Sequence, residues 1–142
     1  MKAFLAVTCF AVLSTAVFSK DWTEILLDDL RAPLVQPPKV ETRKEKDEVI
    51  VRVTNVSKEP LRYFGSSSDH PQKFWEEFKA GKWVAAGWDF CGLGLTTFLI
   101  RPEETVEFRF MKLFFEKDRR LLTVFSSGDW KHGSIILLYQ EN

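Results

Sequence analysis

Most of the chain after residue 48 follows a pattern of alternating apolar and polar residues. This period of two appears over residues 48–54 and again over residues 104–110, with turn residues on either side. The apolar positions of these two segments are Val49, Val51, Val53, Val106, Phe108 and Phe110. Because successive side chains of a strand point to opposite faces, the pattern predicts half-buried strands that bury this apolar set.

Further short strands are predicted between clusters of glycine, proline, serine and asparagine. They cover residues 61–64, 73–79, 82–86, 95–100, 121–126 and 134–140, and Ala80-Gly81 predicts a hairpin between two of them. Residues 65–71 and 87–94 have the composition of loops. Seven or eight short strands at this spacing predict an all-β fold, an antiparallel immunoglobulin-like sandwich of about seven strands. The segments between the strands have no helical pattern, which disfavours a parallel βαβ sheet.

The segment before the strands has a different character. Residues 21–31 have helical spacing of apolar residues, with Asp21 and Glu24 as a capping box, so they predict a short N-terminal helix. Pro33 ends this pattern, and a run of charges follows over residues 41–48. We therefore divide the chain into residues 1–19, a short helix and extended charged linker over 20–47, and an Ig-like sandwich domain over 48–142.

Residues 1–19 are typical of a secretory signal peptide. Lys2 precedes an uncharged, mostly apolar run, and small residues at 17 and 19 favour cleavage between Ser19 and Lys20. Ala16 offers another register for the cut. A retained membrane anchor is the alternative, but the apolar run is shorter than the roughly 20 residues that span a bilayer. The protein is therefore expected to be secreted or periplasmic, with no membrane span after cleavage.

The charge and the cysteine content exclude some classes of function. Removing residues 1–19 removes Lys2 and no other charge, which leaves 19 basic and 20 acidic residues. A balance this even is not the basic footprint of a nucleic-acid-binding protein. Cys9 leaves with the signal, so Cys91 has no intramolecular partner. It is expected to be either a buried free thiol or a thiol for intermolecular pairing.

Three segments resemble bacterial Ig-like domains. The first is residues 51–57 (VRVTNVS) followed by Pro60-Leu61, and the second is residues 99–108 (LIRPEETVEF), where Glu103 replaces the usual glycine of the turn. The glycine-punctuated segment 87–94 resembles a loop of uncharacterised exported Ig-like proteins of environmental bacteria. The resemblance covers roughly residues 48–140 and implies the fold, but it does not fix a function.

The sequence disfavours two kinds of reactive site. A blue-copper site needs two histidines, a cysteine and usually a methionine, which are available as His70, His132, Cys91 and Met111. Their order along the chain is not that of the copper proteins with this ligand set. A nucleophile at Cys91 with either histidine, oriented by Asp89 or Asp129, has no supporting spacing, and the neighbouring Trp88 and Phe90 predict an apolar setting. We therefore expect no catalytic residue, metal or cofactor.

Aromatic residues are the remaining candidates for a site. Trp75, Trp88, Phe90 and Trp130 are candidate binding residues, although filling the core is the simpler explanation for each. Trp75 and Trp83 are predicted to face away from their strand neighbours, which suggests that at least one lies off the core. The expected function is a non-enzymatic exported interaction or structural module with a protein partner. An inhibitor of exported proteases and a glycan-binding module are the alternatives. Asn55-Val56-Ser57 also matches a glycosylation acceptor, which matters only in a eukaryotic secretory pathway.

Overall fold

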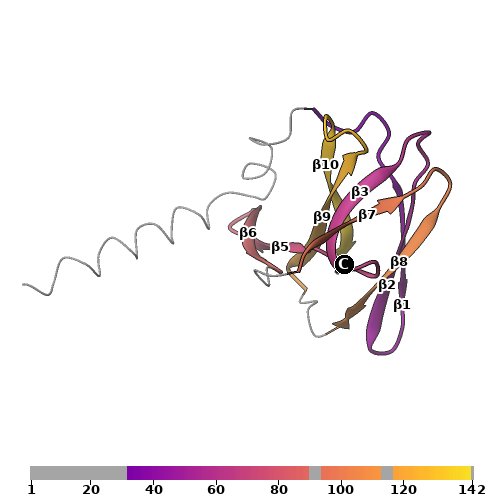
Figure 1. The fold of residues 1–142 in the computed structure, drawn as a ribbon. Coiled ribbons are helices and arrows are strands. Elements are labelled where there is room, and N and C mark those ends of the chain that lie inside the picture. Colours follow the sequence, from indigo (N-terminus) through magenta and orange to yellow (C-terminus); the bar gives the residue numbers. More distant parts are fainter. Residues whose placement is uncertain (1–31, 90–93, 113–116, 142) are drawn as a thin grey trace, which may run out of the picture.

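The computed structural model describes residues 32–89, 94–112 and 117–141. These residues contain ten strands and almost no helix (Figure 1). The strands are β1 (Lys39–Lys44), β2 (Glu48–Thr54), β3 (Leu61–Ser67), β4 (His70–Pro71), β5 (Phe74–Lys79), β6 (Lys82–Trp88), β7 (Thr96–Ile100), β8 (Thr105–Met111), β9 (Arg119–Ser127) and β10 (Gly133–Gln140).

The strands form two antiparallel sheets. A three-stranded sheet has the order β1-β2-β8. A seven-stranded sheet has the order β4-β3-β9-β5-β6, with β10 added to β9 and β7 added to β3. In Figure 1 the three-stranded sheet lies on the right, and β9, β3 and β7 lie beside it. The predicted all-β antiparallel class is confirmed.

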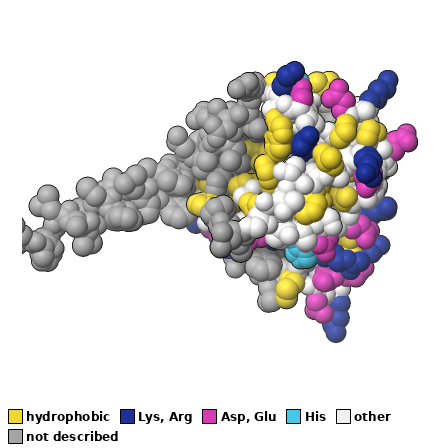
Figure 2. Space-filling model, in the orientation of Figure 1, with side chains coloured by type: hydrophobic (Ala, Val, Ile, Leu, Met, Phe, Trp, Pro, Cys, Tyr) yellow, Lys and Arg dark blue, Asp and Glu magenta, His cyan; other side chains and the backbone are white. Residues whose placement is uncertain are grey.

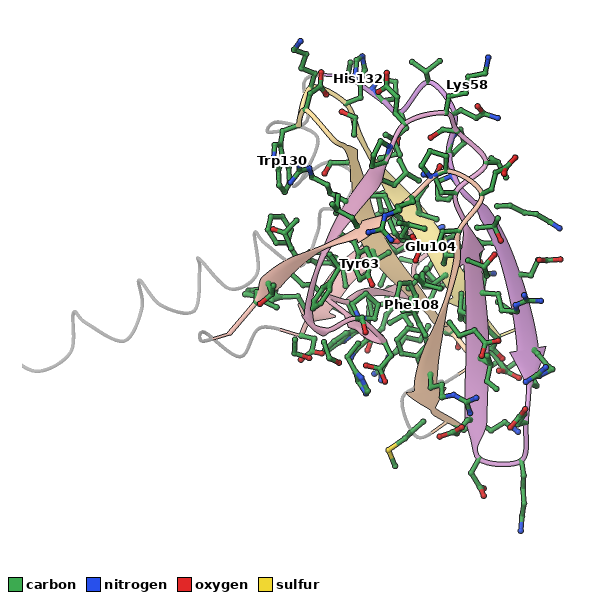
Figure 3. The ribbon with its side chains drawn as sticks, turned by 45° about the vertical axis from the view of Figure 1, so that its right-hand side comes forward. Lys58, Tyr63, Glu104, Phe108, Trp130 and His132 are labelled. Atoms are coloured by element: carbon green, nitrogen blue, oxygen red, sulfur yellow. The ribbon has the colours of Figure 1, made fainter. Side chains whose placement is uncertain are left out.

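The main core lies between the two sheets. The valines at 49, 51 and 53 and Phe108 are fully buried, as the period of two predicts. Tyr63 lies at the centre, with its ring centroid 5.3 Å from that of Phe108 and 5.8 Å from that of Phe125. Figure 3 shows Tyr63 and Phe108 together between the sheets. Edge-to-face packing of this kind adds to the free energy gained by burying the rings.

Two predicted turns are confirmed in detail. β5 and β6 form the predicted hairpin, in which Ala80 and Gly81 both take positive φ, at 51° and 81°. Glu103 has a φ of 66° in the turn before β8, so it takes a left-handed conformation at the position where the resemblance expects glycine. Its amide donates to the carbonyl of Asn55 at 2.9 Å, which ties this turn to the end of β2.

The interpretation of residues 33–47 as a solvated linker is wrong for residues 39–44. This charged segment is strand β1, paired with β2 over its whole length. Val40 packs against the main core, whereas the charged residues are exposed and carry ion pairs such as Lys39–Glu41 at 2.9 Å. Charged side chains protect an edge strand from pairing with other molecules. The same charges gave the segment the composition of a loop.

The interpretation of residues 65–71 as a loop is also wrong. β3 continues to Ser67, and the short strand β4 turns back to pair with it. The turn is closed by the Ser67 hydroxyl, which donates to the Asp69 carboxylate at 2.6 Å. A Cβ at Gly65 would lie 2.5 Å from the carbonyl oxygen of His70, so only glycine permits this close approach.

The predicted signal peptide and the predicted helix over 21–31 lie outside the described residues. Within the described part of the chain, no helix is long and apolar enough to cross a membrane.

Candidate functional site

The seven-stranded sheet has apolar side chains on both of its faces. One face packs on the three-stranded sheet, and we call the opposite one the outer face. Cross-strand pairs on the outer face match apolar residues with each other, as in Phe74 with Leu122 and Val124 with Ile135. Antiparallel sheets usually place polar residues on a second face. An apolar second face is therefore an unusual feature of this protein, and the part of it that is exposed is a candidate binding surface.

The middle of the outer face forms its own small core. Phe74, Ala85 and Leu122 are buried there, with Val124 and Ile135 packed against them. The fully buried Glu76 lies on the same face and pairs with Arg120 on the adjacent strand. Arg120 also lies over the ring of Trp83, 4.6 Å from its centroid.

The end of the outer face carries a group of residues that we call the aromatic cluster: the half-buried Arg62 and the exposed Phe64, Leu99 and Trp130. Phe64 and Trp130 are stacked with their centroids 5.2 Å apart, and the Arg62 guanidinium lies 5.3 Å from the Trp130 ring. Leu99 pairs with Arg62 across β3 and β7. The side chains of Trp130 and Leu99 are 48% and 50% exposed. Figure 3 places Trp130 on the side of the molecule away from the three-stranded sheet.

Figure 2 shows hydrophobic side chains on the face toward the viewer, whereas charged side chains gather along the side of β1, β2 and β8. Charged side chains of the described residues are therefore concentrated on one side of the molecule. Contiguous apolar patches mark interaction sites more often than scattered apolar residues do.

The turn between β9 and β10 holds Trp130 in place. Trp130 has a positive φ of 62°, a conformation that bulky residues rarely adopt without support. Asp129 stabilises this turn, because its carboxylate accepts hydrogen bonds from the Ser127 hydroxyl at 2.6 Å and the Lys131 amide at 3.1 Å. These donors, the Ser127 hydroxyl first, lower the pKa of Asp129 to about 2. Arg62 donates to the Gly128 carbonyl at 2.7 Å, so the cluster is held from both sides.

The structure separates the aromatic residues that the sequence proposed as a site. Trp130 is exposed in the aromatic cluster, and Trp88 is half exposed at the end of β6. Trp75 is half-buried and packs against the main core, so it lies apart from Trp130. Phe90 lies outside the described residues. Arg62, Phe64 and Leu99 belong to the aromatic cluster although the sequence did not predict them as site residues. The alternation of residues along β3 and β7 could have identified them, because each one faces away from the core residues next to it in its strand.

The residues considered for copper and for a nucleophile are not gathered together. His70 and Met111 line one pocket, whereas His132 lines another. Asp89 pairs with Lys73 at 2.6 Å, so this proposed orienting carboxylate has a different partner. Among the described residues, no group of three or more histidines, cysteines or carboxylates could hold a metal. Cys91 and the predicted cleavage site at Ser19 and Lys20 lie outside the described residues.

The apparent glycosylation acceptor is part of the fold. Asn55 is fully buried, and its side-chain amide donates to the carbonyls of Glu59 at 2.8 Å and Ile100 at 2.9 Å. Its side-chain oxygen accepts from the Ser57 amide at 2.9 Å. An amide nitrogen in this setting is not accessible for glycan attachment in the folded protein.

The solved structures that resemble this chain include two distant neighbours. No protein-family model matches the chain, and no curated protein matches it. A structural genomics target called SoR45 is 12% identical, with a TM-score of 0.40 over 72% of this chain and 78% of that one. A Bordetella pertussis protein named ApaA is 13% identical, with a TM-score of 0.40 over 75% of this chain and 93% of that one. Similarity this low defines neither a family nor a function.

Proposed function

We propose that this protein is an exported, non-enzymatic Ig-like module that binds a protein partner through the aromatic cluster. The observation that carries the proposal is the exposed Trp130, stacked on Phe64 and flanked by Arg62 at the end of an apolar sheet face. Tryptophan and arginine are the residue types most enriched among those that dominate the energy of protein interfaces.

The rigidity of the cluster supports this proposal. An exposed aromatic side chain loses rotamer freedom when it binds, and this loss weakens the complex. Here the stack on Phe64 and the hydrogen bonds of Asp129 hold Trp130 before any partner arrives. A partner that covers Trp130 would also cover Leu99, which lies next to Arg62 on β7.

A protein partner fits this surface better than a glycan does. Sugar-binding sites use the open face of an aromatic ring, and Phe64 and Arg62 already contact the Trp130 ring. Trp75, the other tryptophan proposed for a glycan, packs on the main core.

Site-specific photo-crosslinking in the producing organism tests the proposal. Leu99 is replaced by p-benzoylphenylalanine, and the matched control carries the same group at Val56. Val56 is another exposed apolar residue, in the turn after β2 and away from the outer face. We expect one adduct of defined mass from position 99 and none from position 56. Adding Trp130→Ala should weaken the complex by about 2 kcal/mol or more and remove the adduct.

Three results would contradict the proposal. An adduct with the mass of two chains would show that a second copy covers the cluster. A crosslink within the chain to residues 20–31 would show that its own N-terminal segment does so. Equal labelling from positions 99 and 56 would show only nonspecific contact.

A further inference from the structure

A second concave site lies between the sheets, where β8 ends and β9 begins. It is a pocket of about 240 Å³, lined by residues of β4, β5, β8 and β9 together with Lys73 and Asp89. The register places it at the opposite end of β8 from the turn that holds Asn55, because Glu48 pairs with Met111 and Thr54 with Thr105. Its volume is below the roughly 300–1,000 Å³ of pockets for drug-sized ligands, so it suits a smaller molecule.

The floor of this pocket is apolar. Trp75, Phe110 and Leu121 line it, and all three belong to the main core or pack against it. Core packing fixes their positions, so the floor is formed before any ligand binds. A rigid apolar floor favours a flat or compact apolar group, because no side chain has to be ordered on binding.

Among the described residues that line the pocket, basic residues outnumber acidic ones. Its basic residues are Lys73, Arg109, Arg119 and Arg120, and its acidic residue is Asp89. The arginines pair with Glu48, Glu77 and Glu76, none of which lines the pocket. Arg109 and Arg120 alternate along their strands with Phe110 and Leu121 of the main core, so their guanidinium groups face away from the apolar floor. Lys73 is therefore the cation on which a charged ligand at this floor would depend.

Lys73 connects the charged lining to the apolar floor. Its side chain is only 19% exposed, and its ammonium lies 5.7 Å from the centroid of the Phe110 ring. It contacts Asp89 at 2.6 Å, but an ammonium has three hydrogen-bond donors and one carboxylate oxygen takes one of them. An anion in the pocket would therefore meet a lysine held at the edge of an apolar surface.

We propose that this pocket binds a small amphipathic carboxylate, with its apolar or aromatic body on Trp75, Phe110 and Leu121 and its carboxylate at Lys73. In a partly desolvated site, a charge-assisted hydrogen bond to an ammonium is stronger than the same bond made by a neutral amide. Asp89 opposes the ligand, because its carboxylate repels the anion and competes for the same lysine. The site would give the protein a small-molecule ligand in addition to the partner proposed for the outer face.

Binding of 3-phenylpropionate to the exported protein tests this assignment, with 3-phenylpropanamide as the uncharged control of the same shape. The indole N–H resonance of Trp75 is followed by NMR and assigned with Trp75→Phe, and affinities are measured by calorimetry. We expect the acid to bind about tenfold or more tightly than the amide, and to shift the Trp75 resonance. Lys73→Met should weaken the acid about tenfold, whereas Asp89→Asn should strengthen it several-fold.

The opposite signs of these two variants separate a binding role from a structural one. Lys58→Met is the control, because Lys58 lies in the turn at the other end of the sandwich, as Figure 3 shows. If Lys73→Met loses its fold, the gain of Asp89→Asn still tests the site. The proposal is wrong if the amide binds as tightly as the acid, if both variants weaken binding equally, or if the acid leaves Trp75 unshifted.

Discussion

Single buried polar residues determine the turns of this sandwich. Asn55 ends β2, and its side chain replaces backbone partners that the turn after it cannot supply: it donates to two carbonyls and accepts from Ser57. Buried polar groups of this kind are costly only when they lose a partner. The sequence contained this residue in the motif of a glycosylation acceptor, and the pattern alone gave no sign that it was buried.

Replacing Asn55 with alanine should therefore destabilise the protein. The change leaves the carbonyls of Glu59 and Ile100 without this donor in a buried site, and we expect the free energy of unfolding to fall by about 2–3 kcal/mol. Urea unfolding measures the change. Lys58→Ala, an exposed substitution in the same turn, should stay within about 0.5 kcal/mol of the wild type. Equal midpoints for the two variants would contradict a structural role for Asn55.

At the level of elements, eight of the strands were predicted, two from the alternation of their apolar residues and the others from the turn residues on either side of them. β1 and β4 were missed for physical reasons. β1 is an edge strand whose charges protect it, and β4 is too short for any period to appear. The candidate site was predicted only through Trp130. Its partners Arg62 and Phe64 come from β3, and only the pairing of strands brings them to the turn after β9.

The pair of Glu76 on β5 and Arg120 on β9 gives a prediction at this level. Glu76 is fully buried, so removing the cation beside it by Arg120→Met should destabilise the protein by about 3 kcal/mol. The double variant Glu76→Leu with Arg120→Met removes both charges and should recover most of this loss, because the outer face around them is apolar. Thermal unfolding of the two variants makes the comparison. A double variant less stable than Arg120→Met would contradict this, and would show that the Glu76 carboxylate stabilises the fold without its pairing to Arg120.

For the whole molecule, the two sheets differ in how they meet solvent. The exposed face of the three-stranded sheet carries charged pairs such as Arg52–Glu107, whereas the outer face of the seven-stranded sheet is apolar. An alternating pattern predicts one buried face, as it did for β2 and β8. The apolar runs of β9 and β10 are nearly continuous, which is typical of strands with two apolar faces, but such a run does not say which of its residues meet solvent.

Export is the remaining expectation at the scale of the whole molecule, and intact mass spectrometry of the secreted or periplasmic protein tests it. We expect a chain that starts at Lys20, because the small residue Ser19 stands before the cut. Ser19→Tyr should block or move the cut, whereas Lys20→Gln, on the other side of the bond, should leave it in place. A mass that reductant does not change would agree with a buried free thiol at Cys91, and a dimer lost in reductant would assign that thiol to intermolecular pairing. Recovery of the full 142-residue chain in the membrane fraction would contradict cleavage, and would make residues 1–19 an anchor that holds the sandwich at the membrane surface.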